Sequence, residues 1–98
     1  MPELLSLVVP CFNEEKLIDV FYDEVKKVME ELTEYNYEII FTDDGSKDNT
    51  WREIQALNAR DPNVRGIKFS RNFGKEAAIL AGLKLAAGAY IAVIDCDL

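Results

Sequence analysis

The sequence contains no histidine, only two cysteines and three prolines, and no long uninterrupted apolar run. Without histidine, Cys11 and Cys96 lack the partner that most zinc sites use and the imidazole that would activate a thiol nucleophile. The apolar stretches are far shorter than the roughly 20 residues that cross a bilayer. Nor does the opening Met1-Pro2-Glu3 carry the basic flank of a signal peptide. We therefore expect a soluble cytoplasmic protein with two free thiols.

Basic residues are in the minority. Eleven Lys and Arg stand against 18 Asp and Glu, giving a net charge of −7. Because binding to nucleic acid depends on neutralising phosphates with basic side chains, this balance disfavours a nucleic-acid partner. The few glycines and prolines form no repeat and no Ser/Gly-rich linker. With 98 residues, 49% of them hydrophobic, the chain can bury one modest core, which predicts one domain or part of one.

Apolar runs alternate with segments of helical periodicity. Strands are expected at residues 4–10, 38–42, 64–69 and 90–94. The first helix is expected to bury Ile18, Phe21, Val25, Val28 and Leu32, the second follows a cap at Ser46 or Asp48, and the third spans residues 75–87. Alternating strands and helices indicate βαβ units. The predicted fold is α/β, with a parallel sheet of strand order 3-2-1-4 and helices on both faces.

Polar side chains follow each predicted strand at its carboxyl end. In chain order they are Asn13 and Glu14, Asp43 and Asp44, Arg71 and Lys75, Asp95 and Asp97. In a parallel sheet these ends share one edge, and ligands bind in the crevice outside that edge. The pattern therefore predicts a site for a cation together with an anionic ligand.

Asp95 and Asp97 are the candidate metal ligands. At positions i and i+2 of an ending strand, both carboxylates project to one face, where two like charges are costly without a cation. Mg²⁺ or Mn²⁺ suits such oxygen ligands and fills its remaining positions with water and substrate phosphates. An acidic turn is the alternative; the buried strand that precedes the pair favours the metal site.

Asp43-Asp44-Gly45-Ser46 combines a turn with a possible binding group. Gly45 allows a tight turn, and Asp and Ser cap helices, which accounts for one of the two aspartates. The other could accept hydrogen bonds from a nucleobase N–H or a ribose hydroxyl. Asp44 is preferred for that role because it is expected nearer the crevice.

The segment 10–14 has two interpretations. Asn13 could cap the first helix, with Glu14 favourably placed on the helix dipole and Phe12 in the core. Alternatively, the turn lines a nucleoside pocket in which Phe12 supplies apolar contact. Taken alone, the segment favours the first interpretation.

Residues 70–75 precede the third helix and are candidates for binding a diphosphate. Gly74 permits close backbone approach, and the helix N-terminus with Arg71 and Lys75 would attract phosphate oxygens. The segment is no Walker loop, because Glu76 follows Lys75 and the upstream glycine is missing. The chain also lacks a Gly-x-Gly-x-x-Gly dinucleotide motif.

These four segments together resemble a known family. Residues 9–14, 43–50 and 95–98 are similar to successive motifs of the family 2 inverting glycosyltransferases. Residues 70–78 resemble more closely the bacterial polyprenyl-phosphate glycosyltransferases, which are relatives of the dolichol-phosphate mannose synthases. The resemblance covers the whole chain.

The resemblance implies a GT-A fold whose Rossmann-like first half binds a UDP- or GDP-linked sugar. The residues it assigns to nucleotide-sugar binding are Pro10, Phe12, Asn13, Glu14, Asp43, Asp44, Arg71, Lys75 and Asp95. It assigns Mg²⁺ or Mn²⁺ to Asp95 and Asp97, with Asp97 preferred as the direct ligand. The family reaction transfers the sugar to a lipid phosphate at the cytoplasmic face of the membrane.

Family members continue past the second aspartate of this DxD motif with an acceptor half and usually membrane segments. Residues 1–98 are therefore expected to be the N-terminal part of such a domain, without catalytic residues, inactive alone, and self-associating through residues 90–94. A non-catalytic nucleotide-binding or interaction module is the alternative. A phosphoacceptor receiver would need its acidic pair after the first strand, and a sugar nucleotidyltransferase would need a Gly-rich loop there.

Overall fold

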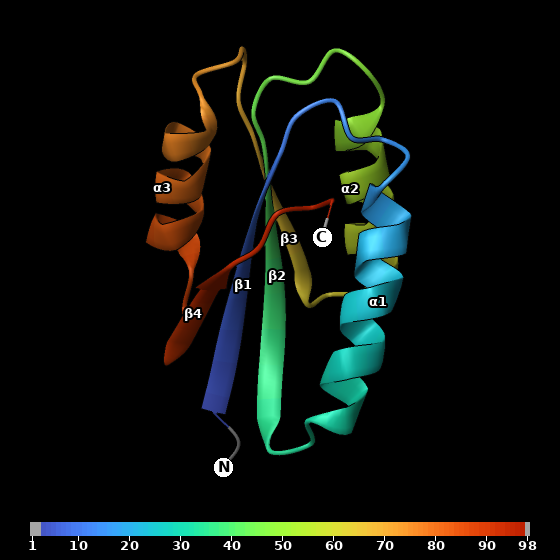
Figure 1. The fold of residues 1–98 in the computed structure, drawn as a ribbon, viewed down its shortest axis with the longest axis vertical. Helices are drawn as coiled ribbons and strands as arrows, with labels where there is room; N and C mark the ends of the chain where they lie inside the picture. The colour runs from blue at the N-terminus through green and yellow to red at the C-terminus, as the bar shows by residue number, and fades with distance from the viewer. Residues whose placement is uncertain (1–2, 98) are drawn as a thin grey trace.

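The computed structural model describes residues 3–97; Met1, Pro2 and Leu98, the last residue of the fourth motif, lie outside this part. Strands and helices alternate along the chain (Figure 1). The elements are β1 (Glu3–Cys11), α1 (Ile18–Glu31), β2 (Tyr35–Asp43), α2 (Thr50–Arg60), β3 (Val64–Lys68), α3 (Lys75–Leu85) and β4 (Tyr90–Val93). No helix in residues 3–97 combines the length and the apolar character needed to cross a membrane.

The four strands form one parallel sheet of order β3-β2-β1-β4, as the sequence predicts. Figure 1 shows α3 on one face of the sheet and α1 with α2 on the other. The register pairs Val9 with Phe41, and Val8 with Val93. All strands therefore run in the same direction and bring their carboxyl ends to one edge.

The larger core lies between the sheet and helices α1 and α2. Alternate residues of β1 and β2 face it, and Phe21 of α1 meets Phe41 of β2 edge to face with ring centroids 5.9 Å apart. The prediction that α1 buries Val28 is wrong, because this side chain is 55% exposed. Tyr22 and Met29 are buried instead. A spacing of four, three and four residues keeps one side of the helix toward the sheet, and it is followed by Ile18, Tyr22, Val25 and Met29. Val28 lies outside this row of buried residues.

Helix α3 packs on the opposite face through small residues. Ala78 and Gly82 are buried, while Leu80 and Leu83 are 54% and 38% exposed. A Cβ atom on Gly82 would lie 2.5 Å from Val8 Cγ1, so only glycine permits this approach. The helix ends at Leu85, two residues earlier than expected, because Ala86 adopts extended backbone angles.

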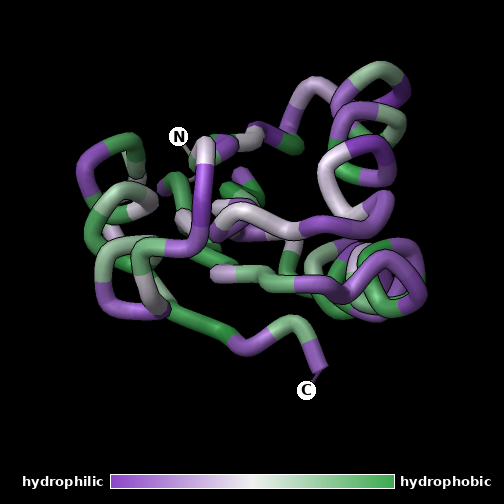
Figure 2. Tube along the Cα trace, turned by 90° about the horizontal axis from the view of Figure 1, so that it is seen from above, coloured by the Kyte–Doolittle hydropathy of each residue, from purple (hydrophilic) through white to green (hydrophobic). Residues whose placement is uncertain are grey.

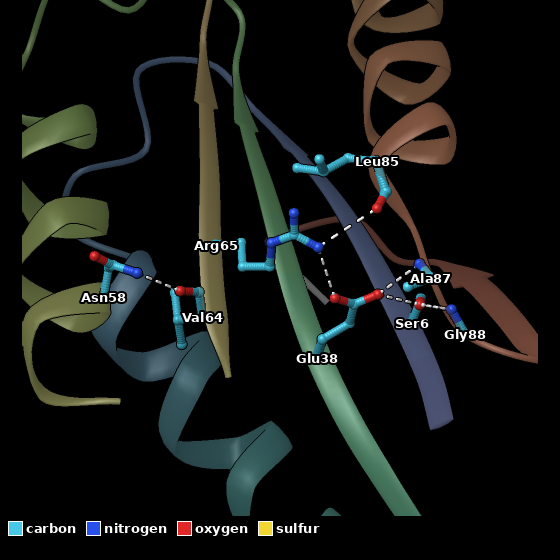
Figure 3. Close-up of polar contacts among 8 residues, drawn as sticks. All are labelled: Ser6, Glu38, Asn58, Val64, Arg65, Leu85, Ala87 and Gly88. Atoms are coloured by element: carbon cyan, nitrogen blue, oxygen red, sulfur yellow. Dashed lines mark hydrogen bonds and ion pairs between the residues drawn. The ribbon is translucent and has the colours of Figure 1, made fainter. Parts of the chain in front are cut away.

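A buried polar cluster fixes the segment after α3 (Figure 3). Glu38, only 7% exposed, accepts hydrogen bonds from Ser6 Oγ at 2.6 Å, Ala87 N at 2.8 Å and Arg65 at 3.1 Å. Burial acts to raise the pKa of Glu38, but these three donors outweigh it, so its pKa is lowered. The cluster ties β1, β2, β3 and the α3–β4 connection together.

Candidate nucleotide and cation site

A cavity of about 190 Å³ opens at the carboxyl edge of the sheet. Its lining residues are Pro10, Cys11, Phe12, Glu14, Asp44, Lys75, Ala78, Asp95 and Asp97. Seven of the ten residues that the sequence singled out are among them. The other three, Asn13, Asp43 and Arg71, lie outside the lining. The parallel topology thus brings residues from four separate segments to one place.

The cavity is acidic. Four carboxylates line it, and Lys75 supplies the one ammonium group of the lining. Lys75 Nζ lies 2.7 Å from Asp95 Oδ1, and both side chains are more than half exposed. The hydrogen bond and charge of Asp95 raise the pKa of Lys75, which therefore stays protonated. An ion pair this exposed stabilises the fold little, so it can be exchanged for contacts to a ligand.

Glu14 carries an unsatisfied oxygen into this acidic environment. Its Oε1 accepts a long hydrogen bond of 3.4 Å from Phe12 N, while its buried Oε2 has no partner among the described residues. Burial raises the pKa of Glu14, and the charges of Asp97 and Asp95 raise it further, against the lowering effect of the hydrogen bond from Phe12 N. A donor or a cation entering the cavity would relieve this carboxylate.

Asp95 and Asp97 fit a hard divalent cation that a ligand helps to hold. Both are exposed, and Cys96 between them is buried, so the two carboxylates share the outer side of the segment. Within residues 3–97 no three acidic, cysteine or histidine side chains are arranged to enclose a metal ion. Two carboxylates with water and phosphate oxygens nevertheless make a complete shell for Mg²⁺ or Mn²⁺.

The adjacent aspartates of the β2–α2 turn have separate surroundings. Asp43 is fully buried, and its Oδ1 accepts a hydrogen bond from Ser46 N at 3.0 Å. This contact closes the turn. The expected cap at Ser46 or Asp48 is wrong, because α2 begins at Thr50 after Asn49 and has no side-chain cap. Asp44 is 4% exposed and borders the cavity, which agrees with its predicted position nearer the crevice.

Asn13 locks two loops together. Its backbone N–H donates to Ser46 Oγ at 2.7 Å, and its Oδ1 accepts from Lys47 N at 2.9 Å. The capping interpretation of Asn13 is wrong, because α1 begins at Ile18 after Leu17, with no side-chain cap. Asn13 has a φ of 52°, a left-handed conformation that asparagine adopts more readily than most residues. Sequence spacing alone could not reveal this contact between residues more than 30 positions apart.

Arg71 is not among the residues that line the cavity. Its guanidinium carbon is 4.7 Å from the centre of the Phe73 ring, and both side chains are exposed. Cys11, which lines the cavity, and Cys96 are both free and buried, as the sequence predicts. A hydrogen bond with Cys96, and then burial, raise the pKa of Cys11 far above its usual range. Cys11 therefore has little thiolate character and serves packing.

A parallel α/β sheet with a ligand cavity outside its carboxyl edge is the architecture of nucleotide-binding α/β proteins. The chain belongs to glycosyl transferase family 2, whose family model matches residues 6–98.

Alignments with known relatives cover nearly the whole chain, and about half of the aligned residues are identical. It is 53% identical over 94 residues to a prophage bactoprenol glucosyl transferase homolog of Escherichia coli K12. It is 52% identical to the bactoprenol glucosyl transferase of Shigella phage SfV. Each match covers 96% of this chain and 30% of the relative. The chain therefore spans about a third of the length of these relatives.

Solved structures of lower sequence identity share the fold. A mannosyltransferase from Pyrobaculum calidifontis, in complex with GDP-Man and Mn²⁺, matches with a TM-score of 0.82 at 22% identity. Staphylococcus aureus TarS 1–349 in complex with UDP matches with a TM-score of 0.78 at 24% identity. Both matches cover 99% of this chain and 28% of the other. They confirm the Rossmann-like fold that the sequence predicts for the first half of a GT-A domain.

Proposed function

We propose that residues 1–98 form the nucleotide-sugar-binding part of a metal-dependent, inverting glycosyltransferase. The donor is a UDP- or GDP-linked sugar, and the acceptor is a polyprenyl phosphate at the cytoplasmic face of a membrane. Family membership and the relatives named as bactoprenol glucosyl transferases support this class of acceptor and favour glucose as the sugar.

The nucleoside is proposed to lie against the β1 end of the cavity. Pro10 and Phe12 offer apolar surface there, and Phe12 is 42% exposed although it is a large hydrophobic residue. The unpartnered Oε2 of Glu14 is a ready acceptor for a ribose hydroxyl or a base N–H. Filling this end would therefore cover exposed apolar surface and satisfy a buried oxygen in one step.

The diphosphate is proposed to lie between Lys75, at the N-terminus of α3, and the Asp95–Asp97 pair. The proposal that binding requires a metal ion rests on one observation: the lining holds four carboxylates and one ammonium group. Such a cavity repels a diphosphate unless a cation neutralises the acidic groups. When bound by Asp95 and Asp97, that cation would act as a Lewis acid that stabilises the departing diphosphate.

The three predicted residues outside the lining receive different roles in this proposal. Asn13 and Asp43 hold the two loops that frame the nucleoside end, through their contacts with Ser46. Arg71 lies outside the lining, and we propose that its exposed guanidinium approaches the outer phosphate of a ligand longer than the cavity. None of these residues is assigned a catalytic step, so we expect binding without sugar transfer from this chain alone.

Calorimetric titration of the chain with UDP and with GDP, each with and without Mn²⁺, tests the proposal. Binding of one nucleotide that strengthens at least tenfold with Mn²⁺ is expected, and ADP with Mn²⁺ is the control for a merely cation-bridged diphosphate. Equal affinity with and without the metal, or no selectivity over ADP, would contradict it. Transfer of sugar to a polyprenyl phosphate by the chain would contradict the absence of catalytic residues.

A further inference from the structure

Lys75 holds one of the two candidate metal ligands in the ligand-free protein. Its Nζ lies 2.7 Å from Asp95 Oδ1, a distance typical of a charge-assisted hydrogen bond. Asp97, two residues further on, makes no ion pair within the described residues. A divalent cation that binds both aspartates must therefore share Asp95 with an ammonium group that repels it, or bind there after that group has moved away.

Lys75 needs an anionic partner because of its place on α3. It is the first residue of the helix, where the helix dipole puts partial positive charge, so an ammonium group is unfavourable there by itself. Gly74 precedes it without a side-chain cap, and the first N–H groups of a helix, here those of Lys75, Glu76 and Ala77, have no acceptor within the helix. Asp95 supplies negative charge beside Lys75 in the ligand-free protein, and phosphate oxygens would supply it when a diphosphate is bound.

Little packing holds the Lys75–Asp95 pair in place. The side chain of Lys75 is 60% exposed and that of Asp95 is 56% exposed. An ion pair in this position contributes little to stability, and the flexible four-carbon stem of lysine lets the ammonium group turn to another acceptor. Because both residues line the cavity proposed for the diphosphate, the new acceptor would be within the same site.

We propose that Lys75 couples the binding of the cation to the binding of the diphosphate by exchanging partners. It neutralises Asp95 in the ligand-free protein and turns to the phosphates when a divalent cation is bound at Asp95. This inference rests on the proposed function, because it takes the anionic ligand to be a nucleoside diphosphate. Either ligand alone has to break the Lys75–Asp95 pair, whereas the two together break it once. The pair therefore opposes each ligand alone and makes their binding cooperative, by the same factor for both.

The first test is the affinity of Lys75→Met for Mn²⁺ alone, with unbound Mn²⁺ followed by electron paramagnetic resonance. The substitution removes the charge and keeps an apolar side chain of similar length. We expect Mn²⁺ to bind about fivefold more tightly than to the wild type, the upper end of what an exposed ion pair contributes. A loss of structure could not produce such a gain in affinity.

The matched control is Lys84→Met, which removes the same charge in the last turn of α3, outside the cavity lining. Because solvent and salt screen a charge at that distance, it should change the affinity for Mn²⁺ by less than about twofold. If Lys75 served only to bind phosphate, without competing for Asp95, the two variants would bind Mn²⁺ alike.

Nucleotide titrations should show the opposite sign. At saturating Mn²⁺, Lys75→Met should bind UDP, or GDP if that is the nucleotide bound, about tenfold more weakly, the loss that corresponds to one charged hydrogen bond. Lys84→Met should stay within about twofold of the wild type. A nucleotide affinity that Lys75→Met leaves unchanged would show that Lys75 does not turn to the phosphates and would overturn the exchange.

The two sets of titrations separate this inference from the proposed function. If Lys75→Met binds Mn²⁺ no more tightly than Lys84→Met does, the exchange is overturned, even where the wild type binds a nucleotide and the proposed function holds. A wild-type chain that binds Mn²⁺ but neither UDP nor GDP would refute the proposed function. The titrations with Mn²⁺ alone would then still decide whether Lys75 competes with the cation for Asp95.

Discussion

Asp95 and Asp97 stand two residues apart but have different surroundings. Asp95 is paired with Lys75 at 2.7 Å, whereas Asp97 makes no ion pair within the described residues. A cation that approaches the cavity therefore meets in Asp97 a carboxylate whose charge is not already balanced. This difference supports the preference for Asp97 as the direct metal ligand, which remains a proposal.

We predict that Asp97→Asn weakens Mn²⁺-assisted nucleotide binding at least roughly tenfold, the size of loss that changes around metal sites produce. Lys47→Ala is the comparison, because Lys47 is exposed, lies outside the cavity lining and contributes only its backbone N–H to Asn13. Its effect should stay within about twofold. Calorimetry with both variants measures the difference; equal losses would show that the acidic pair serves only as a turn.

At the scale of elements, α3 and β1 meet through one glycine. A methyl group at Gly82 would sit 2.5 Å from Cγ1 of the fully buried Val8. Although alanine favours a helix by up to about 1 kcal/mol over glycine, overpacking costs about 1–3 kcal/mol. We therefore predict that Gly82→Ala lowers the free energy of unfolding by about 1 kcal/mol. Urea denaturation tests this, with exposed Lys84→Ala as the control; a stabilised Gly82→Ala would show that α3 shifts freely on the sheet.

Glu38 links the stability of the sheet to pH. Because its pKa in the folded protein is lowered, the carboxylate adds stability above its unfolded pKa of roughly 4.3, and this contribution is lost as pH falls through the folded value. We predict that Glu38→Gln costs about 1–3 kcal/mol at pH 7 and that the variant loses less stability than wild type below about pH 4. Urea denaturation from pH 3 to pH 7 measures both. Parallel pH profiles for the two proteins would contradict a stabilising role of the ionised form.

The sheet order, the shared polar edge and seven lining residues could be predicted from the sequence, because strand and helix periods are local patterns and parallel topology fixes where strands end. Contacts between distant loops could not. Asn13 and Ser46 meet across 33 positions, and nothing in either segment alone specifies that bond. The sequence places Glu38 in a strand but does not reveal its partners, since Ser6 comes from β1, Arg65 from β3 and Ala87 from the α3–β4 connection.

At the scale of the whole molecule, the two edges of the sheet differ. The β3 edge carries Arg65 and Lys68, and charged side chains of this kind discourage pairing with another strand. The β4 edge has the sequence Tyr-Ile-Ala-Val without a charge, and Tyr90, Ile91 and Val93 are 53%, 45% and 45% exposed. Figure 2 shows a green, hydrophobic stretch on the outside of the molecule, which turns purple shortly before the C-terminus.

Beside β4, an apolar groove of about 360 Å³ runs along the α1 face of the sheet. Leu5, Leu7 and Ile94 contribute to it from the sheet side, and Val28 and Met29 from α1. The exposed edge and this groove both present apolar surface, a feature that marks interfaces. The partner that fits an unpaired backbone edge is another extended strand, and a second copy of the chain offers one with the same uncharged sequence.

We therefore predict that the 98-residue chain self-associates through β4 at high micromolar concentration, as sedimentation velocity would show. The net charge of −7 opposes association, so raising the salt concentration should shift the equilibrium toward the larger species by screening this repulsion. Ile91→Lys places a charge on the edge strand and should return the chain to a monomer. Val20→Lys introduces the same charge at another exposed apolar residue, on α1, and should leave association unchanged. A wild-type chain that stays monomeric, or a Val20→Lys variant that dissociates as fully as Ile91→Lys, would mean that the β4 edge is not what holds copies together.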